Sequence, residues 1–159
     1  RAALADGTID IVATDHAPHP VEAKECEWDA AANGMVGLES ALSVVQQTMV
    51  DPGLIGWADV ARVLSTTPAR IGRLAGHGEP VAAGSAAELT LVDPSASSEF
   101  GTDRLAGRSV NSPYLGRTLP GRVVATFHRG VPTVLDGVVR PADEVAAASA
   151  RVGRGGSRG

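Results

Sequence analysis

The sequence predicts an α/β fold in which the last βα unit of a parallel array is followed by part of a small β-sheet. Three observations support this prediction. An apolar, β-branched run at 9–13 follows Gly7 and predicts a buried strand. Helical patterns occupy much of 38–74, and short strand patterns begin at residue 88. Neither half has enough elements to form a complete domain.

Composition and charge exclude several classes of protein. The 159 residues include 14 Lys and Arg against 18 Asp and Glu, which gives a formal net charge of −4 and no basic field for nucleic acid. Hydrophobic residues make up 43% and charged residues 20%, as in globular rather than disordered chains. No apolar run is long enough to span a membrane. The single cysteine, Cys26, excludes an internal disulfide framework and a cysteine-based zinc cluster, so we expect a cytoplasmic protein.

Three consecutive helices are predicted in the first half of the chain. Apolar residues at steps of three and four predict the first over 38–50. The second is predicted over 58–64 and the third over 67–74, with Thr67 as its N-cap and Pro68 at its first position. The apolar stripe of the first helix consists of Leu38, Ala41, Leu42, Val45 and Met49. The polar residues off this stripe, which we expect to be solvated, are Glu39 and Gln46.

The second half of the chain predicts a small sheet. Its strand patterns lie at 88–93, 122–128, 131–135 and 138–139. Two turn pairs of the kind that close hairpins separate the last three patterns, Arg129-Gly130 and Asp136-Gly137. Residues 94–120 predict a loop, and the arginine- and glycine-rich end at 151–159 predicts disorder.

The residues with the richest chemistry directly follow the first predicted strand, in the segment Thr14-Asp15-His16-Ala17-Pro18-His19. In α/β barrels the carboxyl ends of the strands form the catalytic face. Asp15 offers a hard anionic oxygen to a divalent metal and can also take up a proton. Spacing alone leaves open that Asp15 caps a turn and that both histidines are surface loop residues. No His-x-His pair occurs, and the remaining histidines are His77 and His128.

Five segments of the chain, taken in order, resemble one enzyme family. ATDHAPH at 13–19 and NGMVGLESAL at 33–42 are similar to the closing barrel strand and helix of a class I bacterial dihydroorotase, in the amidohydrolase superfamily. The later segments are similar to those that the family carries after its barrel: TTPARIGRL (66–74), AAGSAAELTLVDP (82–94) and SVNSPYLGRTLPGRVVATFHRG (109–130). The resemblance covers nearly everything from Ile9 to about Val139.

The resemblance implies a C-terminal fragment. The fold would be the C-terminal portion of an amidohydrolase (β/α)8 barrel followed by strands of a small composite β-sandwich. Residues 1–76 would hold the last strand and C-terminal helices of the barrel, 77–145 an incomplete sandwich portion, and 146–159 a disordered tail. Because a complete barrel takes about 250 residues, we expect the fragment to be inactive alone.

The resemblance also implies an activity and a set of site residues. The reaction would be the reversible, zinc-dependent cyclisation of N-carbamoyl-L-aspartate to L-dihydroorotate and water, in de novo pyrimidine synthesis. Asp15 would be the catalytic base and acid and a ligand of one or two zinc ions, whose other ligands would lie upstream of residue 1. His19 would hold a substrate carboxylate, and Asn33 and Gly34 would contact substrate through backbone groups. His16 would brace the strand end by hydrogen bonding.

Two alternatives stay open. Another cyclic amidohydrolase, such as an allantoinase or a dihydropyrimidinase, is disfavoured by His19, because those substrates lack the carboxylate. A catalytically silent dihydroorotase-like subunit could instead scaffold aspartate transcarbamoylase, although the presence of both Asp15 and His19 favours the active enzyme. The implied partner is a small-molecule substrate, and a homo-oligomer or an association with aspartate transcarbamoylase is left open.

Overall fold

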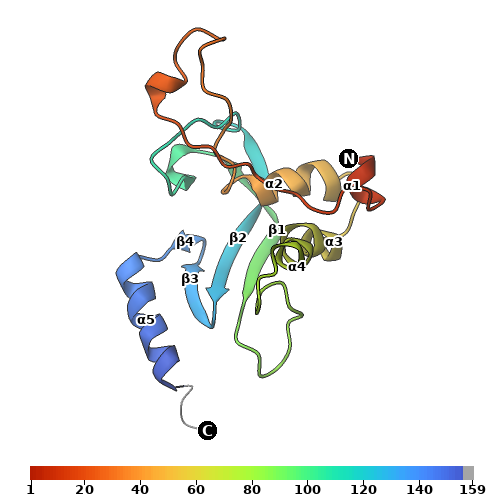
Figure 1. Cartoon of the computed structure of the whole chain (residues 1–159), viewed down its shortest axis with the longest axis vertical. Coiled ribbons are helices and arrows are strands. Elements are labelled where there is room, and N and C mark those ends of the chain that lie inside the picture. The colour runs from red at the N-terminus through yellow and green to blue at the C-terminus, as the bar shows by residue number, and fades with distance from the viewer. Residues whose placement is uncertain (156–159) are drawn as a thin grey trace.

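The computed structural model describes residues 1–155 as a helical part followed by a four-stranded antiparallel sheet, which confirms the α/β class (Figure 1). The helices and helical turns are α1 (Ala2–Ala5), η1 (Val21–Ala23), α2 (Ala41–Val45), η2 (Gln46–Val50), α3 (Trp57–Ala61), η3 (Arg62–Thr66), α4 (Thr67–Gly72), η4 (Thr102–Arg104) and α5 (Ala142–Gly155). The strands, paired in this order, are β1 (Leu89–Glu99), β2 (Thr118–His128), β3 (Val131–Leu135) and β4 (Val138–Val139).

The strand predicted over 9–13 is not formed. The segment carries no strand assignment, and the nearest pairing is one isolated parallel bridge between His16 and Met35. A strand is stabilised by the ladder of hydrogen bonds that it shares with a neighbour, and this segment pairs with none of β1–β4. Instead, the backbone N–H of Val12 donates to the carbonyl of Val63 at 3.1 Å, so the segment lies against η3.

The predicted helices form with shifted ends and with π-helical turns. α2 begins at Ala41, so Leu38 lies outside it and is exposed. α3, η3 and α4 follow one another without a break, and Thr67 is helical with φ −70° and ψ −43°. Thr67 is therefore not an N-cap, and that prediction is wrong. Pro68 has no N–H for the preceding turn, and the π-turn η3 accommodates this loss without ending the helix.

Apolar side chains of the helical part form the main core. Val63 lies within this cluster and is fully buried, with 0% exposure. The other buried members are Leu4, Val45, Met49, Ile55 and Val60. A second buried pair, Phe100 and Leu119, lies where the chain leaves β1 and enters β2, and each is 1% exposed.

Gln46 joins the helical part to the sheet. It is 4% exposed, and its Nε2 donates to the carbonyl of Pro94 in β1 at 2.9 Å. Its Oε1 lies against Gly121 of β2, where an added Cβ would be only 2.3 Å away. The prediction of a solvated Gln46 is wrong, because this side of the helix packs on β2. Glu39 is not solvated either: its Oε1 accepts from the backbone N–H of Ala106 at 3.1 Å, and its Oε2 is buried.

The sheet agrees closely with the predicted strands. β3 and β4 have the predicted bounds, while β1 and β2 extend into 94–120, the range where a loop is predicted. The ladder between β1 and β2 has two register shifts, one between Leu91 and Val92 and one between Asp93 and Ser97. Such irregularities let a strand keep its pairing beyond residues that do not fit the ladder. Both predicted hairpin turns are confirmed, with positive φ at each central residue: Arg129 (49°), Gly130 (80°), Asp136 (52°) and Gly137 (77°). Positive φ at both positions matches the twist of the strands they join.

Helix α5 occupies most of the predicted tail. The tail over 146–159 is expected to be disordered, whereas α5 extends to residue 155 and packs on β3; the last four residues lie outside the described ones. Asp143 and Glu144 in its first turn interact favourably with the helix dipole. Glu144 also pairs with Arg140 one turn earlier. Among the described helices, none is long and apolar enough to cross a membrane.

We predict that Gly121→Ala destabilises the protein more than Gly130→Ala. Both positions have positive φ, 77° and 80°, so both substitutions strain the backbone. Only the Cβ at 121 also meets the Gln46 carboxamide, because nothing lies within 4 Å of the position at 130. Overpacking adds about 1–3 kcal/mol, which denaturant unfolding of both variants would measure. Equal destabilisation would contradict the close contact between helix and sheet.

Candidate functional site

Asp15 ends the extended segment in an unusual backbone conformation. Its φ is 46°, in the left-handed region that few residues other than glycine adopt. Such strain is concentrated at functional sites. The residue is exposed, and its carboxylate makes no hydrogen bond or ion pair with the described part of the chain. A carboxylate held in this way is available to a group outside the described residues.

His16 fixes the end of this segment against the entry to α2. Its Nδ1 is 3.2 Å from the backbone nitrogen of Gly37 and 3.4 Å from that of Leu38. Since a backbone N–H only donates, Nδ1 is the acceptor and the ring proton is on Nε2. The backbone N–H of Ala17 also donates to the carbonyl of Met35 at 2.9 Å. The hydrogen bonding predicted for His16 is confirmed, but it fixes the end of an extended segment and not the end of a strand.

The structure brings His19 to Asn33. The Nε2 of His19 lies 2.9 Å from the carbonyl oxygen of Asn33. A carbonyl only accepts, so Nε2 carries a proton and Nδ1 is the ring atom without a partner among the described residues. The Asn33 side chain is exposed and takes no part in this contact. The contribution of Asn33 is therefore its main chain.

Gly34 lies against Ala17 and requires a glycine. Its φ is +99°, and an added Cβ would be 2.6 Å from the Cβ of Ala17. Its carbonyl accepts from Nζ of Lys24 at 3.0 Å and from Nδ2 of Asn111 at 3.3 Å. Its N–H makes no hydrogen bond with the described residues. The backbone group of Gly34 that remains open is thus the donor.

Residues outside the predicted site hold this loop in place. Lys24 Nζ donates to the carbonyl of Ala32 at 2.6 Å as well as to Gly34, which closes the loop at its base. Ser109 and Asn111 bind the backbone of His19 from a segment about 90 residues away. The sequence feature that could have indicated these two residues is their place in the segment 109–130, which resembles dihydroorotases, and close to Pro113.

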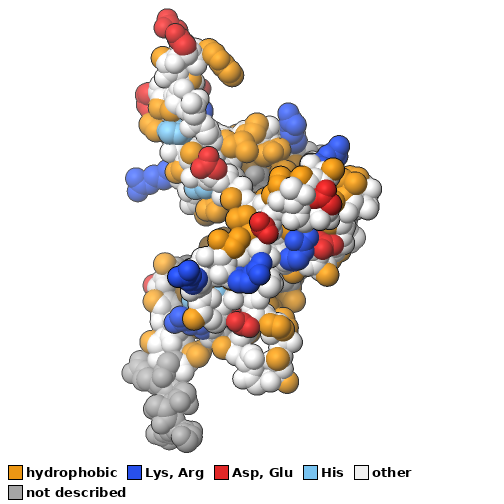
Figure 2. Space-filling view, turned by 45° about the vertical axis from the view of Figure 1, so that its right-hand side comes forward, with side chains coloured by type: hydrophobic (Ala, Val, Ile, Leu, Met, Phe, Trp, Pro, Cys, Tyr) orange, Lys and Arg blue, Asp and Glu red, His pale blue; other side chains and the backbone are white. Residues whose placement is uncertain are grey.

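The remainder of the loop extends away from the body. In Figure 1 the segment around η1 rises above the rest of the chain, and Figure 2 shows acidic side chains at its end. Glu22, Glu25, Glu27 and Asp29 of this segment are exposed. Trp28 is 95% exposed, which is rare for an aromatic side chain. Only the base of the loop is packed against other segments.

The described residues do not form a metal site by themselves. Asp15 supplies one carboxylate, whereas a zinc ion takes three or four protein ligands. Within residues 1–155, no group of three or more His, Cys, Asp and Glu side chains is placed to hold a metal ion. A metal ion held at Asp15 would need further ligands from outside the described residues.

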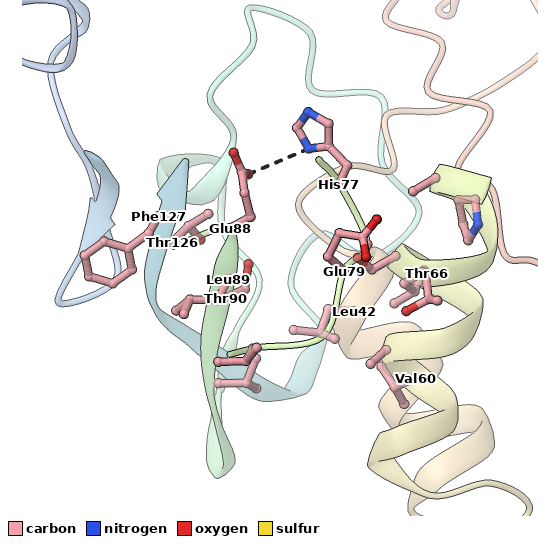
Figure 3. Close-up of a pocket in the computed structure, with 18 of the residues that line it drawn as sticks. Leu42, Val60, Thr66, His77, Glu79, Glu88, Leu89, Thr90, Thr126 and Phe127 are labelled. Atoms are coloured by element: carbon pink, nitrogen blue, oxygen red, sulfur yellow. Dashed lines mark ion pairs between the residues drawn. The ribbon is translucent and has the colours of Figure 1, made fainter. Parts of the chain in front are cut away.

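A second cluster of titratable groups lies at one end of an apolar groove between the helices and the sheet (Figure 3). The groove has a volume of about 1020 Å³. The carboxylate oxygens of Glu88 contact two histidines, at 3.1 Å from Nδ1 of His128 and at 3.7 Å from Nδ1 of His77. The imidazole rings are stacked, with centroids 5.8 Å apart and an interplanar angle of 8°. The backbone N–H of Arg129 donates to Glu88 at 2.9 Å.

Comparison of the sequence with curated proteins identifies the family of this chain. The chain is 78% identical over 139 residues to a protein named dihydroorotase from Leifsonia xyli subsp. xyli, covering 87% of this chain and 32% of that protein. It is 53% identical over 140 residues to the dihydroorotase of Mycobacterium tuberculosis, covering 88% and 33%. The chain belongs to the dihydroorotase family. It spans about a third of the length of these dihydroorotases, and no protein-family model matches it.

Solved structures agree on the wider fold. An L-hydantoinase (dihydropyrimidinase) from Arthrobacter aurescens superposes with a TM-score of 0.76 at 29% identity, covering 88% of this chain and 32% of that one. A D-hydantoinase (dihydropyrimidinase) from Thermus sp. gives 0.72 at 28% identity, covering 87% and 31%. This dihydroorotase segment therefore has the fold of the corresponding part of these hydantoinases.

We predict that Glu88→Gln makes the free energy of unfolding less sensitive to a fall in pH. Burial raises the pKa of Glu88, but hydrogen bonds from Arg129 and His128 and the charges of both histidines lower it below its ordinary value of 4.5 overall. A lowered carboxyl pKa contributes stability above pH 4.5, and this is lost as the pH falls through the folded-state value. Below pH 4.5, the wild-type free energy of unfolding should therefore fall more steeply than that of Glu88→Gln.

Urea unfolding at a series of pH values would measure this difference. Glu79→Gln is the control, because Glu79 is an exposed carboxylate in the same groove. Parallel profiles for wild type and Glu88→Gln would show that the Glu88 contacts contribute nothing to folding.

Proposed function

We propose that the complete protein is a dihydroorotase, which catalyses the reversible cyclisation of N-carbamoyl-L-aspartate to L-dihydroorotate and water. The observation that carries the proposal is the 78% identity over 139 residues to a protein of that name. The geometry supports it, because the residues that the family resemblance selects lie in adjoining segments at 15–19 and 33–38. The substrate is a small molecule, and we assign the reaction to the cytoplasm.

Asp15 is the catalytic residue of this proposal. Its exposed carboxylate would take up a proton from the attacking water in the hydrolytic direction and return it to the amide nitrogen as the ring opens. A carboxylate without a competing partner among the described residues is suited to this exchange. We further propose that Asp15 is this chain's ligand for one or two zinc ions, whose Lewis acidity would polarise the carbonyl.

His19 and the Asn33-Gly34 backbone would hold the substrate. Because Nε2 of His19 donates to the Asn33 carbonyl, a substrate carboxylate would bind at Nδ1. Nδ1 can donate at the same time as Nε2 only in the imidazolium form, which also supplies the opposite charge. The N–H of Gly34 would add a second donor, because its carbonyl is already bound twice.

We also propose the architecture that the family implies for the whole protein. Residues 1–76 would then complete a (β/α)8 barrel, and 9–13 would become its last strand once the neighbouring strands are present. Residues 77–145 would belong to a composite β-sandwich. The absence of a strand at 9–13 is consistent with this, because a parallel strand without neighbours has no ladder.

A second candidate function is a hydantoinase-type activity. It is supported by the likeness to solved hydantoinases, at 28–29% identity. The 78% identity to a dihydroorotase outweighs this likeness. His19 is the discriminating residue, since a hydantoin ring brings no carboxylate for it to bind.

We predict that Asp15→Asn in the full-length protein lowers the turnover of dihydroorotate at least 100-fold, within the range lost with a general base. Asparagine keeps the shape of the side chain and tolerates positive φ, so the fold should be preserved. Glu79→Gln, which changes an exposed carboxylate outside this segment, serves as the control and should keep full activity. Retained activity in Asp15→Asn would assign the proton transfer elsewhere. Wild-type turnover of hydantoin in place of dihydroorotate would favour the second candidate.

We predict that the isolated 159-residue chain neither binds zinc stoichiometrically nor turns over dihydroorotate. Its described residues bring together no group of three metal-binding side chains, and Asp15 alone would hold zinc weakly. Equilibrium dialysis with zinc and an assay of dihydroorotate hydrolysis would test this. Stoichiometric zinc together with turnover would show that residues 1–159 suffice for the reaction.

A further inference from the structure

Ser109 binds both backbone polar groups of His19. The N–H of His19 donates to Ser109 Oγ at 3.0 Å, and Ser109 Oγ is 2.6 Å from the carbonyl oxygen of His19. Ser109 Oγ also contacts Oδ1 of Asn111. A hydroxyl has one proton and two lone pairs, so Ser109 accepts from the His19 N–H while it donates to one of these two oxygens. Ser109 Oγ thus fixes the main chain of His19 at its N–H, and also at its carbonyl when the hydroxyl proton points there.

Asn111 connects the two segments that carry the proposed substrate groups. Its Nδ2 donates to the carbonyl of Ala17 at 3.0 Å and to that of Gly34 at 3.3 Å. Its main-chain carbonyl accepts from the N–H of Val36 at 3.2 Å. One side chain therefore connects the start and the end of the loop at 17–34.

These contacts lie beneath the candidate site. Every bond from Ser109 and Asn111 to the loop goes to main-chain groups, so neither residue takes the place of a substrate contact. Nδ1 of His19 and the N–H of Gly34 remain open. Both residues come from the segment between β1 and β2, which Figure 1 shows in turquoise beside the base of the projecting loop.

We propose that Ser109 and Asn111 are positioning residues that hold the His19 ring and the Gly34 N–H at the spacing needed for the substrate carboxylate. This inference rests on the proposed function. A displacement of about 1 Å in a substrate-binding group can reduce activity as much as 100-fold. His19 and Gly34 would hold the ground state and the transition state alike, so loosening them raises KM and leaves kcat nearly unchanged.

The test compares variants of the full-length enzyme. We expect Ser109→Ala and Asn111→Ala to raise KM for dihydroorotate about tenfold or more, with little change in kcat. Ser109→Thr keeps the hydroxyl and should restore KM. Ser112→Ala is the matched control, because among the described residues the Ser112 hydroxyl binds only the nearby N–H of Tyr114, at 3.3 Å. An unchanged KM in both alanine variants, or an equal rise in Ser112→Ala, would overturn the proposal.

Hydrogen exchange on the substrate-free proteins separates this proposal from the proposed function. Amides at 17–36 should exchange faster in Asn111→Ala than in wild type, while amides of the β2–β3 hairpin should not change. Unchanged exchange at 17–36 would overturn the positioning role, whatever the activity. If the wild type fails to turn over dihydroorotate, the proposed function and the kinetic part of this inference both fall, and the exchange experiment still decides whether the two residues anchor the loop.

Discussion

The position of the sheet relative to the helices depends on the contact that Gln46 makes with β1 and β2. The buried carboxamide is bound to the carbonyl of Pro94 on one side and packs against Gly121 on the other, so it meets both β1 and β2. With these strands fixed, the segment that joins them is directed toward the loop at 17–34. The polar contact with the sheet thus determines where Ser109 and Asn111 lie relative to His19.

Local sequence signals predicted the elements that form without distant partners. The turn pairs at 129–130 and 136–137 fix both hairpins, because the glycine of each pair adopts positive φ freely and positive φ at both positions matches the strand twist. The apolar spacing over 38–50 also predicted the helix that forms as α2 and η2. The motif at 13–19 resembles dihydroorotases, and the similarity to curated dihydroorotases confirms that family.

Features set by long-range contacts could not be predicted in the same way. Residues 9–13 have the composition of a strand, but a strand also needs a neighbour, and the described part of the chain offers none there. Gln46 has a polar side chain, and nothing local shows that its two partners come from β1 and β2. The contacts of Ser109 and Asn111 with the loop cross about 90 residues, so neither hydrophobic periodicity nor motif spacing reveals them.

The π-turn η3 also limits how the length of this chain can change. An α-helix advances by about 100° per residue, and a π-turn contains one residue more than the α-helical turn it replaces. Removal of one residue from 62–66 would turn η3 into a regular α-helical turn, and α4 would keep nearly the same facing because the turn loses only its extra residue. The buried side chains of Thr67 and Ala69 would then keep their present neighbours. Removal of one residue from α4 itself would instead rotate the helical residues that follow it by about 100°.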